Sequence, residues 1–181
     1  MKQKLKLALV GAGERGQYCY APYAKMHGYE IEFVAVADPH KGRREKFVQD
    51  YHVPAEGVFE TAEQFFARPR MADAVLICTQ DSQHYAYACQ AIDLGYSILL
   101  EKPISPSVRE CLDLQRRAEE KGTQIMVCHV MRYTKFYRKL KELIDSGVIG
   151  DVVHVTHTEN VAYWHYAHSY VRGNWHKTAD S

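Results

Sequence analysis

Three glycines stand near the N-terminus, where a run of apolar residues ends. Gly11, Gly13 and Gly16 follow the spacing G-x-G-x-x-G, with Glu14 and Arg15 before the last glycine. In such a turn the first glycine allows a tight reversal, the second lets backbone N–H groups approach a pyrophosphate, and the third lets a helix pack close to a strand. The spacing predicts that these five residues form a diphosphate-binding turn.

The residues around the turn supply the elements that such a site needs. Leu5–Val10 predict a strand, and residues 15–25 predict a helix whose N-terminus offers unpaired N–H groups and a positive dipole end. Asp38 follows a second predicted strand, Ile31–Ala37, about 20 residues beyond the last glycine, where a carboxylate accepts hydrogen bonds from a ribose 2′-OH. Together these features predict a dinucleotide-binding βαβ unit.

The charges near Asp38 bear on which dinucleotide is bound. A carboxylate at this position repels a 2′-phosphate and therefore favours NAD. His40, Lys41 and Arg43 follow closely, and this basic cluster could hold the 2′-phosphate of NADP, or could simply form the solvated start of a helix. We predict NAD as the cofactor and keep NADP as the alternative.

Short apolar runs alternate with helical stretches over the first part of the chain. Further strands are predicted at residues 74–78, 97–100 and 124–127, and helices at residues 41–51, 61–67, 84–94 and 105–121. Ser105 followed by Pro106 is expected to cap the last of these helices. The alternation predicts an α/β fold, with a doubly wound, mostly parallel Rossmann sheet over residues 1–128.

The pattern changes after residue 128. Residues 135–146 predict an amphipathic helix, residues 151–158 alternate weakly as a strand does, and an aromatic, His-rich stretch follows. One helix and one strand cannot close a core of their own. We therefore expect residues 129–181 to begin an α+β substrate and oligomerisation domain that this chain does not complete.

Composition argues against several classes of function. The 181 residues are 46% hydrophobic and carry a formal net charge of +1, which favours neither nucleic acid nor an anionic membrane as a partner. No apolar run is long enough to span a bilayer, and no signal segment precedes the first strand. The five cysteines are scattered without a C-x-x-C pair, which indicates reduced, mostly buried thiols in a cytoplasmic protein.

The stretch LLEKPIS, residues 99–105, resembles a motif of the glucose–fructose oxidoreductase / inositol dehydrogenase / rhizopine-catabolism (Gfo/Idh/MocA) family of NAD(P)-dependent oxidoreductases. In that family E-K-P follows a strand of the nucleotide-binding domain. VGAGERG resembles the opening of the same domain, and RYTKFYRKLKELIDSGVIGDVVHV resembles the entry to the second domain. The resemblance implies hydride transfer between a nicotinamide cofactor and a sugar, polyol or related hydroxy or carbonyl substrate.

The resemblance assigns roles to the E-K-P residues. Lys102 would be the catalytic residue, close to the nicotinamide and the substrate hydroxyl, and Glu101 would bond the nicotinamide ribose or carboxamide. A lysine desolvated in such a site has its pKa lowered toward neutrality, so that it can exchange a proton while the hydride moves. Without the resemblance, Lys102 would be read as a surface lysine in a loop.

Further residues are expected to bind the cofactor. Thr79, Gln80 and His84 follow the third clear strand, and ligands bind beyond the carboxyl ends of parallel strands. His84 could instead be an ordinary residue at a helix start. By resemblance, Arg132 at the junction between the domains and Trp175 near the C-terminus line the same site.

Histidines crowd the last part of the chain, at positions 154, 157, 165, 168 and 176. His154 and His157 would point to opposite faces of a strand, and no carboxylate or cysteine stands at a zinc spacing around His165 and His168. We therefore predict no metal site.

One alternative to an enzyme stays open, a non-catalytic nucleotide-binding or sensing module. Val130 and His176 stand where the family often carries asparagine and arginine. The expected partners are a small sugar or polyol and, for the full-length protein, further copies of itself through the second-domain sheet. This chain alone is expected to bind cofactor with little turnover.

Overall fold

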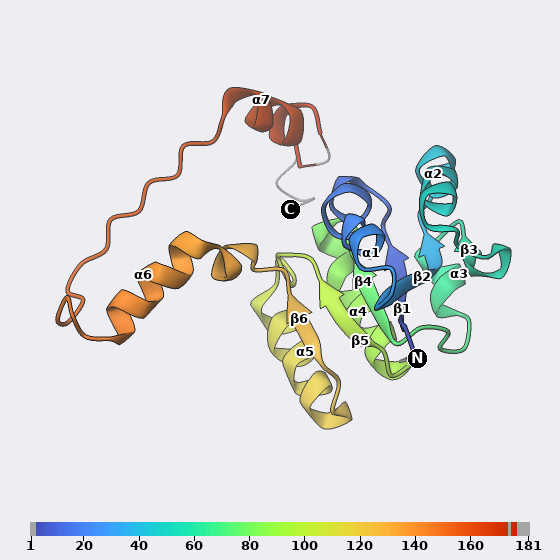
Figure 1. Ribbon diagram of the computed structural model, residues 1–181, viewed down its shortest axis with the longest axis horizontal. Helices are drawn as coiled ribbons and strands as arrows, with labels where there is room; N and C mark the ends of the chain where they lie inside the picture. The colour runs from blue at the N-terminus through green and yellow to red at the C-terminus, as the bar shows by residue number, and fades with distance from the viewer. Residues whose placement is uncertain (1–2, 174, 177–181) are drawn as a thin grey trace. The chain divides into compact units, whose positions relative to one another are not determined.

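Six strands from the first part of the chain form one parallel sheet (Figure 1). The computed structural model describes residues 3–173, 175 and 176. The strands are β1 (Leu5–Val10), β2 (Ile31–Ala37), β3 (Val58–Phe59), β4 (Ala74–Ile77), β5 (Ser97–Leu100) and β6 (Ile125–Val127). Their order is β3-β2-β1-β4-β5-β6, and each neighbouring pair is parallel. This is the predicted doubly wound Rossmann arrangement.

Helices cover both faces of the sheet. They are α1 (Pro22–Met26), α2 (Lys41–Tyr51), α3 (Ala62–Phe66), α4 (His84–Asp93) and α5 (Val108–Lys121), with short helical turns η1 (Glu14–Tyr20), η2 (Ala55–Gly57) and η3 (Asp81–Gln83). Successive strand residues point to opposite faces, so Leu7 and Leu9 of β1 pack in one apolar core with α1 and α2, whereas Ala8 and Val10 pack in another with α3, α4 and α5. The two cores hold the strand ends in place.

The chain divides into two compact units between Val127 and Cys128. The second unit contains η4 (Val130–Tyr133), α6 (Lys135–Asp145), α7 (Tyr163–Tyr166) and η5 (Ala167–Val171). Helix α6 forms as predicted. The prediction of a strand at residues 151–158 is wrong, because residues 152–160 have no regular structure and are exposed. A strand needs a neighbouring strand for its backbone hydrogen bonds, and no described segment pairs with this one.

Two further predictions also need correction. Helix α5 is capped by Ser107, whose hydroxyl accepts a hydrogen bond from the Glu110 N–H at 3.4 Å, and not by Ser105. The Ser105 hydroxyl instead accepts from the Ser107 N–H at 3.0 Å. Of the five free cysteines, Cys128 is buried and Cys19 is exposed, so the thiols are less buried than expected. No helix within the described ranges has both the length and the apolar character needed to cross a membrane.

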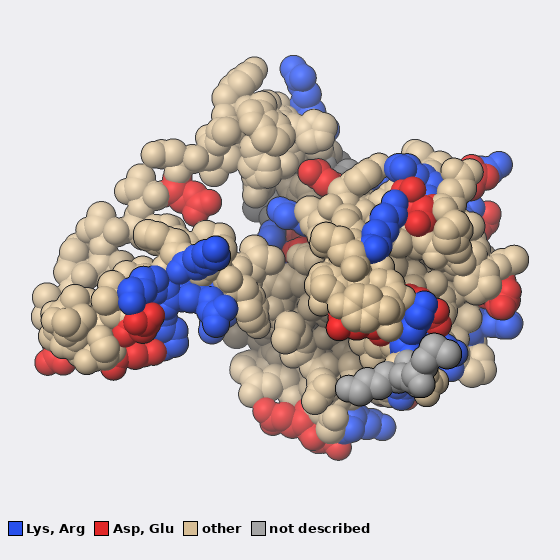
Figure 2. All heavy atoms as spheres, viewed as in Figure 1, with Lys and Arg blue, Asp and Glu red and all other residues tan. Residues whose placement is uncertain are grey.

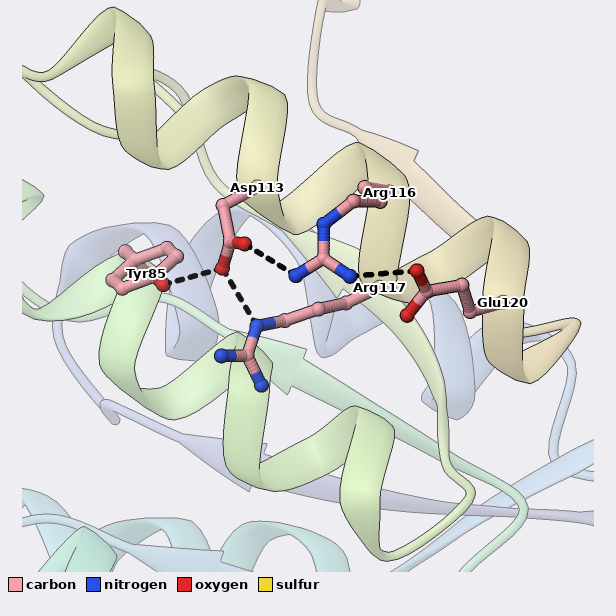
Figure 3. Close-up of polar contacts among 5 residues, drawn as sticks. All are labelled: Tyr85, Asp113, Arg116, Arg117 and Glu120. Atoms are coloured by element: carbon pink, nitrogen blue, oxygen red, sulfur yellow. Dashed lines mark hydrogen bonds and ion pairs between the residues drawn. The ribbon is translucent and has the colours of Figure 1, made fainter.

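A charged cluster joins α4 to α5 (Figure 3). The Tyr85 hydroxyl on α4 donates to Asp113 on α5 at 2.7 Å, and the guanidinium groups of Arg116 and Arg117 contact the same carboxylate at 2.7 and 2.6 Å. These hydrogen bonds, from Tyr85 first and then from the two arginines, hold the pKa of Asp113 well below its usual range. The bond to Asp113 raises the pKa of Tyr85 to about 12. Asp113 is therefore the common acceptor of an inter-helix clamp.

We expect Asp113→Asn to lower the melting temperature at pH 7 by a few degrees, because the clamp loses its charge. A carboxyl whose folded-state pKa is depressed contributes stability above its unfolded pKa of about 4, and this contribution is lost as the pH falls through the folded-state pKa. The difference between variant and parent should therefore shrink as the pH falls below about 4. Thermal unfolding followed by circular dichroism at several pH values measures it.

Glu120→Gln provides the matched control. Glu120 pairs with Arg116 at 2.6 Å but is 58% exposed, and this pair lies within α5. We expect a smaller effect on the melting temperature than that of Asp113→Asn. Equal effects of the two substitutions at pH 7 would show that the Tyr85–Asp113 contact between helices contributes little.

Candidate functional site

The ends of four strands meet at one edge of the sheet. In the parallel register, the last residue of β1 pairs with the last residues of β2 and β4, and the last residue of β4 pairs with that of β5. Gly11, Asp38, Cys78 and Glu101 directly follow these four strands. The predicted glycine turn, the Asp38 carboxylate predicted to bind the ribose, and the E-K-P motif are therefore neighbours at the edge where parallel sheets bind ligands.

The three glycines of the turn have different surroundings. Gly11 has a φ of +93°, and a Cβ placed on it would lie 2.7 Å from the carbonyl carbon of Cys78. A Cβ on Gly16 would lie 2.8 Å from Leu9 Cδ1, so this glycine allows the close approach of η1 to β1. A Cβ on Gly13 would meet no atom within 4 Å. The outer two glycines are therefore needed by the fold itself, whereas the middle glycine faces open space.

The segment after the turn is not the single helix predicted over residues 15–25. It forms the π-helical turn η1, with Glu14 and Arg15 exposed in its first turn, and then α1, which starts at Pro22. Proline lacks the N–H that would continue a helix and fits the first helical position. The break at Pro22 therefore separates two short helical segments. π-helical turns often occur at functional sites.

Asp38 is held tightly at the end of β2. It is 4% exposed, and its Oδ2 accepts from the Ala12 N–H at 2.7 Å while its Oδ1 accepts from the His40 N–H at 2.8 Å. Arg44 of α2 donates to the Asp38 carbonyl oxygen at 2.7 Å. Through its bond to Ala12, Asp38 therefore holds the glycine turn against the end of β2. A carboxylate oxygen can accept a second hydrogen bond, so the predicted bond to a ribose hydroxyl stays compatible with this geometry.

The loop after β4 brings Thr79, Gln80 and His84 together. The Gln80 backbone N–H donates to the Gln83 side chain at 3.3 Å, which begins η3. His84 is 1% exposed, and its ring nitrogens lie 2.6 Å from the Pro103 carbonyl oxygen and 3.2 Å from that of Thr79. In this geometry His84 links two loops, and its direct contact with the cofactor stays a prediction.

The E-K-P residues follow β5. Glu101 is 6% exposed; one carboxylate oxygen accepts from the Tyr20 hydroxyl, and the other accepts from the Lys102 N–H at 2.9 Å. The Lys102–Pro103 peptide bond is cis. Lys102 lies in the loop past the end of β5 and is exposed. The first unit therefore does not bury its ammonium group, contrary to our expectation.

Two predicted site residues belong to the second unit. Arg132 lies in η4 and is exposed, and Trp175 lies in a turn and is half-buried. Their proposed contact with the cofactor stays a prediction.

Sequence reasoning missed the roles of Tyr20 and Arg44. Tyr20 contacts Glu101 across 81 positions of sequence, and Arg44, which is 8% exposed, links Asp38 to Glu60. The signal for Arg44 is a basic residue in the first turn of the helix after Asp38, where we considered only His40, Lys41 and Arg43. No local sequence pattern predicts the contact of Tyr20 with Glu101.

The site residues fit a dinucleotide on observations independent of the motif. Gln17 Nε2 and Thr79 Oγ1 are buried without a hydrogen-bond partner in the part of the chain that the structure describes. Gln17 lies in η1 after the glycine turn, and Thr79 lies just past the end of β4. Buried polar atoms without partners are costly. With the open space at Gly13, they indicate room and hydrogen-bonding capacity for a polar ligand.

Acidic and basic side chains are intermixed on the face visible in Figure 2, and the described residues form no cluster of metal ligands. Figure 2 shows acidic and basic side chains mixed over the visible face of the sheet unit, in keeping with a formal net charge of +1. Within residues 3–173, 175 and 176, His, Cys, Asp and Glu side chains form no group of three or more that could hold a metal ion.

A sheet of this order with a glycine turn after β1 and an acidic residue after β2 defines a dinucleotide-binding Rossmann domain. The family model described as "Oxidoreductase family, NAD-binding Rossmann fold" matches residues 5–129. The chain belongs to this family, the Gfo/Idh/MocA oxidoreductases.

Relatives of known name agree with this assignment. The chain is 31% identical over 157 residues to an inositol 2-dehydrogenase of Pseudomonas savastanoi pv. phaseolicola, covering 84% of this chain and 46% of that protein. It is 26% identical over 163 residues to a scyllo-inositol 2-dehydrogenase (NADP(+)) of Bacillus subtilis, covering 90% and 42%. The structure of apo scyllo-inositol dehydrogenase from Lactobacillus casei matches with a TM-score of 0.75 at 24% identity, over 83% of this chain and 44% of that one, which shows a shared fold. The chain spans less than half the length of these curated relatives.

Proposed function

We propose that the chain forms the cofactor-binding part of an NAD(P)-dependent oxidoreductase acting on a sugar, polyol or related hydroxy or carbonyl compound. The observation that carries the proposal is the glycine turn, with its open space at Gly13, beside Asp38 and the E-K-P motif at one sheet edge. The family assignment and the named dehydrogenases among the relatives support it.

Different residues along this edge of the sheet would bind different parts of the cofactor. Backbone N–H groups of the turn from Gly11 to Gly16 would hold the diphosphate, and Asp38 would bind the adenosine ribose. Glu101 and Lys102, after β5, lie two strands away from the turn in the sheet order and would face the nicotinamide half. When bound, the nicotinamide supplies the hydride acceptor or donor.

Lys102 would move the proton. In the oxidation of an alcohol, the substrate carbon loses a hydride while its hydroxyl oxygen loses a proton, and Lys102 Nζ, as the free amine, would accept that proton. In the reduction of a carbonyl, Lys102 Nζ would return it to the oxygen. Positioned proton transfer of this kind contributes a rate factor of about 100 to 10,000. The exposed side chain of Lys102 in the first unit is free to reach a bound substrate.

The test of this function is direct binding followed by turnover. Calorimetry should detect binding of NADH or NADPH to the chain, and the full-length protein should change absorbance at about 340 nm when offered a panel of polyols and sugars with oxidised cofactor. Binding without turnover on any substrate would favour a non-catalytic nucleotide-binding module. Absence of binding to either cofactor would contradict the proposal as a whole.

Asp38 should make the site prefer NADH. We expect NADH to bind at least about tenfold more tightly than NADPH, because the buried carboxylate repels the 2′-phosphate. Asp38→Asn removes the charge and should reduce this ratio severalfold. Since Asp38 also braces the glycine turn, the variant can weaken both ligands, and the ratio of the two dissociation constants is therefore the quantity to compare. A parent protein that prefers NADPH would show that His40, Lys41 and Arg43 dominate instead.

A further inference from the structure

The backbone on either side of Lys102 is held from two directions. On one side, the buried Glu101 carboxylate accepts from the Tyr20 hydroxyl with one oxygen and from the Lys102 N–H with the other, at 2.9 Å. On the other side, the Pro103 carbonyl oxygen lies 2.6 Å from His84 Nδ1, in a ring that is 1% exposed. Lys102 is the exposed member of the motif. The residues on either side of Lys102 are thus hydrogen-bonded to distant parts of the unit, while the Lys102 side chain is exposed.

Tyr20 reaches Glu101 from a distant part of the sequence. It is the last residue of η1, the helical turn that directly follows the glycine turn. Its half-buried ring also packs against the core that contains Leu9 and Phe47. Phenylalanine at this position would keep that packing and lose the hydroxyl, so the hydrogen bond to Glu101 can be removed separately from the apolar contacts.

We propose that Tyr20 is a positioning residue for Lys102. Through Glu101, its hydroxyl ties the segment after the diphosphate-binding turn to the segment that carries the proton-transfer lysine. This inference rests on the proposed function and adds a residue to it. Tyr20 sets the placement of the nicotinamide-side segment and leaves the adenosine and diphosphate side to the glycine turn and Asp38.

The test compares two ligands that differ in the nicotinamide. NADH contains both halves of the cofactor, whereas ADP-ribose contains the adenosine, the diphosphate and the second ribose without the nicotinamide. Calorimetry on Tyr20→Phe should show NADH bound at least about fivefold more weakly than by the parent, with the affinity for ADP-ribose unchanged within about twofold. Tyr18→Phe removes a hydroxyl from the same helical turn at a residue that is 60% exposed, and should change neither affinity.

A second readout follows Lys102 itself. In the parent, NADH should protect Lys102 from acylation by acetyl N-hydroxysuccinimide ester, measured by mass spectrometry of its peptide. In Tyr20→Phe this protection should fall severalfold, and in Tyr18→Phe it should stay at the parent level. A purely structural role for the hydroxyl would lower the melting temperature without changing the protection of one lysine at saturating NADH.

Several outcomes would overturn the inference. They are an equal loss of NADH and ADP-ribose affinity in Tyr20→Phe, no loss of either, or unchanged protection of Lys102. If Tyr20→Phe does not fold, Tyr20→Leu takes its place, because it also keeps an apolar side chain against the core and lacks the hydroxyl. It must show the same selective loss of NADH affinity, and parent-like binding by that variant would overturn the inference. A parent chain that binds neither ligand would instead contradict the proposed function, so the two failures are distinguishable.

Discussion

Lys102→Ala is expected to lower turnover of the full-length protein by about 100- to 10,000-fold while NADH binding changes by less than about fivefold. The reason is that, in the proposed function, Lys102 transfers the proton while other residues hold most of the cofactor. The backbone N–H of Lys102 contacts Glu101, and alanine keeps that N–H, so the motif retains its backbone geometry. The lost group is the exposed amine that would exchange the proton with the substrate oxygen.

The measurement is steady-state kinetics on a substrate found in the polyol and sugar panel, together with calorimetry for NADH. Lys121→Ala is the control, since Lys121 is exposed at the end of α5 and should leave both quantities at the parent level. Turnover of Lys102→Ala within about threefold of the parent would remove Lys102 from the chemistry, whatever the cofactor affinity.

Alanine substitutions at two positions of the glycine turn should have different effects, one on the stability of the fold and the other on NADH binding. Gly11→Ala is expected to reduce the free energy of unfolding by about 3 kcal/mol or more, because its φ of +93° is strained for alanine and the new Cβ meets the backbone of Cys78. Gly13→Ala meets no atom within 4 Å and should leave stability nearly unchanged. It should nevertheless weaken NADH binding at least about tenfold, or about 1.4 kcal/mol, because the Cβ takes the space in which we propose that the diphosphate binds.

Gly122→Ala isolates the conformational part of the Gly11 effect. Gly122 has a φ of +64° at the end of α5, and a Cβ there meets nothing within 4 Å, so the expected cost is only about 1 kcal/mol. Denaturant unfolding of the three variants and calorimetry with NADH give both quantities. A Gly13→Ala variant as unstable as Gly11→Ala, or one that binds NADH like the parent, would show that the space beside Gly13 is not the diphosphate site.

Local signals were sufficient to predict most of the first unit. Apolar runs bounded by turn residues predict β1, β2 and β5 with the bounds that the structure shows. They do not reveal β3, because two residues carry no period. Pro22 carries a readable signal for the helix break that follows η1, and the prediction of one helix over residues 15–25 overlooked it.

The rest depends on contacts that the sequence pattern does not specify. Ser105 and Ser107 are both acceptable N-caps, and the bonds that the Ser105 hydroxyl makes to its neighbours decide between them. The strand expected at residues 151–158 depends on a pairing partner, which no local pattern supplies. The contact of Tyr20 with Glu101 likewise depends on the fold that brings η1 to the end of β5.

The most direct test of the account is a ¹H–¹⁵N correlation spectrum of the isotope-labelled chain titrated with NADH. We predict that the largest shift changes fall on the backbone amides of residues 11–16, Asp38, Thr79 and residues 101–102, which follow the ends of β1, β2, β4 and β5. Saturable changes confined to amides elsewhere in the chain, with these strand-end residues unmoved, would contradict the central claim that this sheet edge holds the dinucleotide.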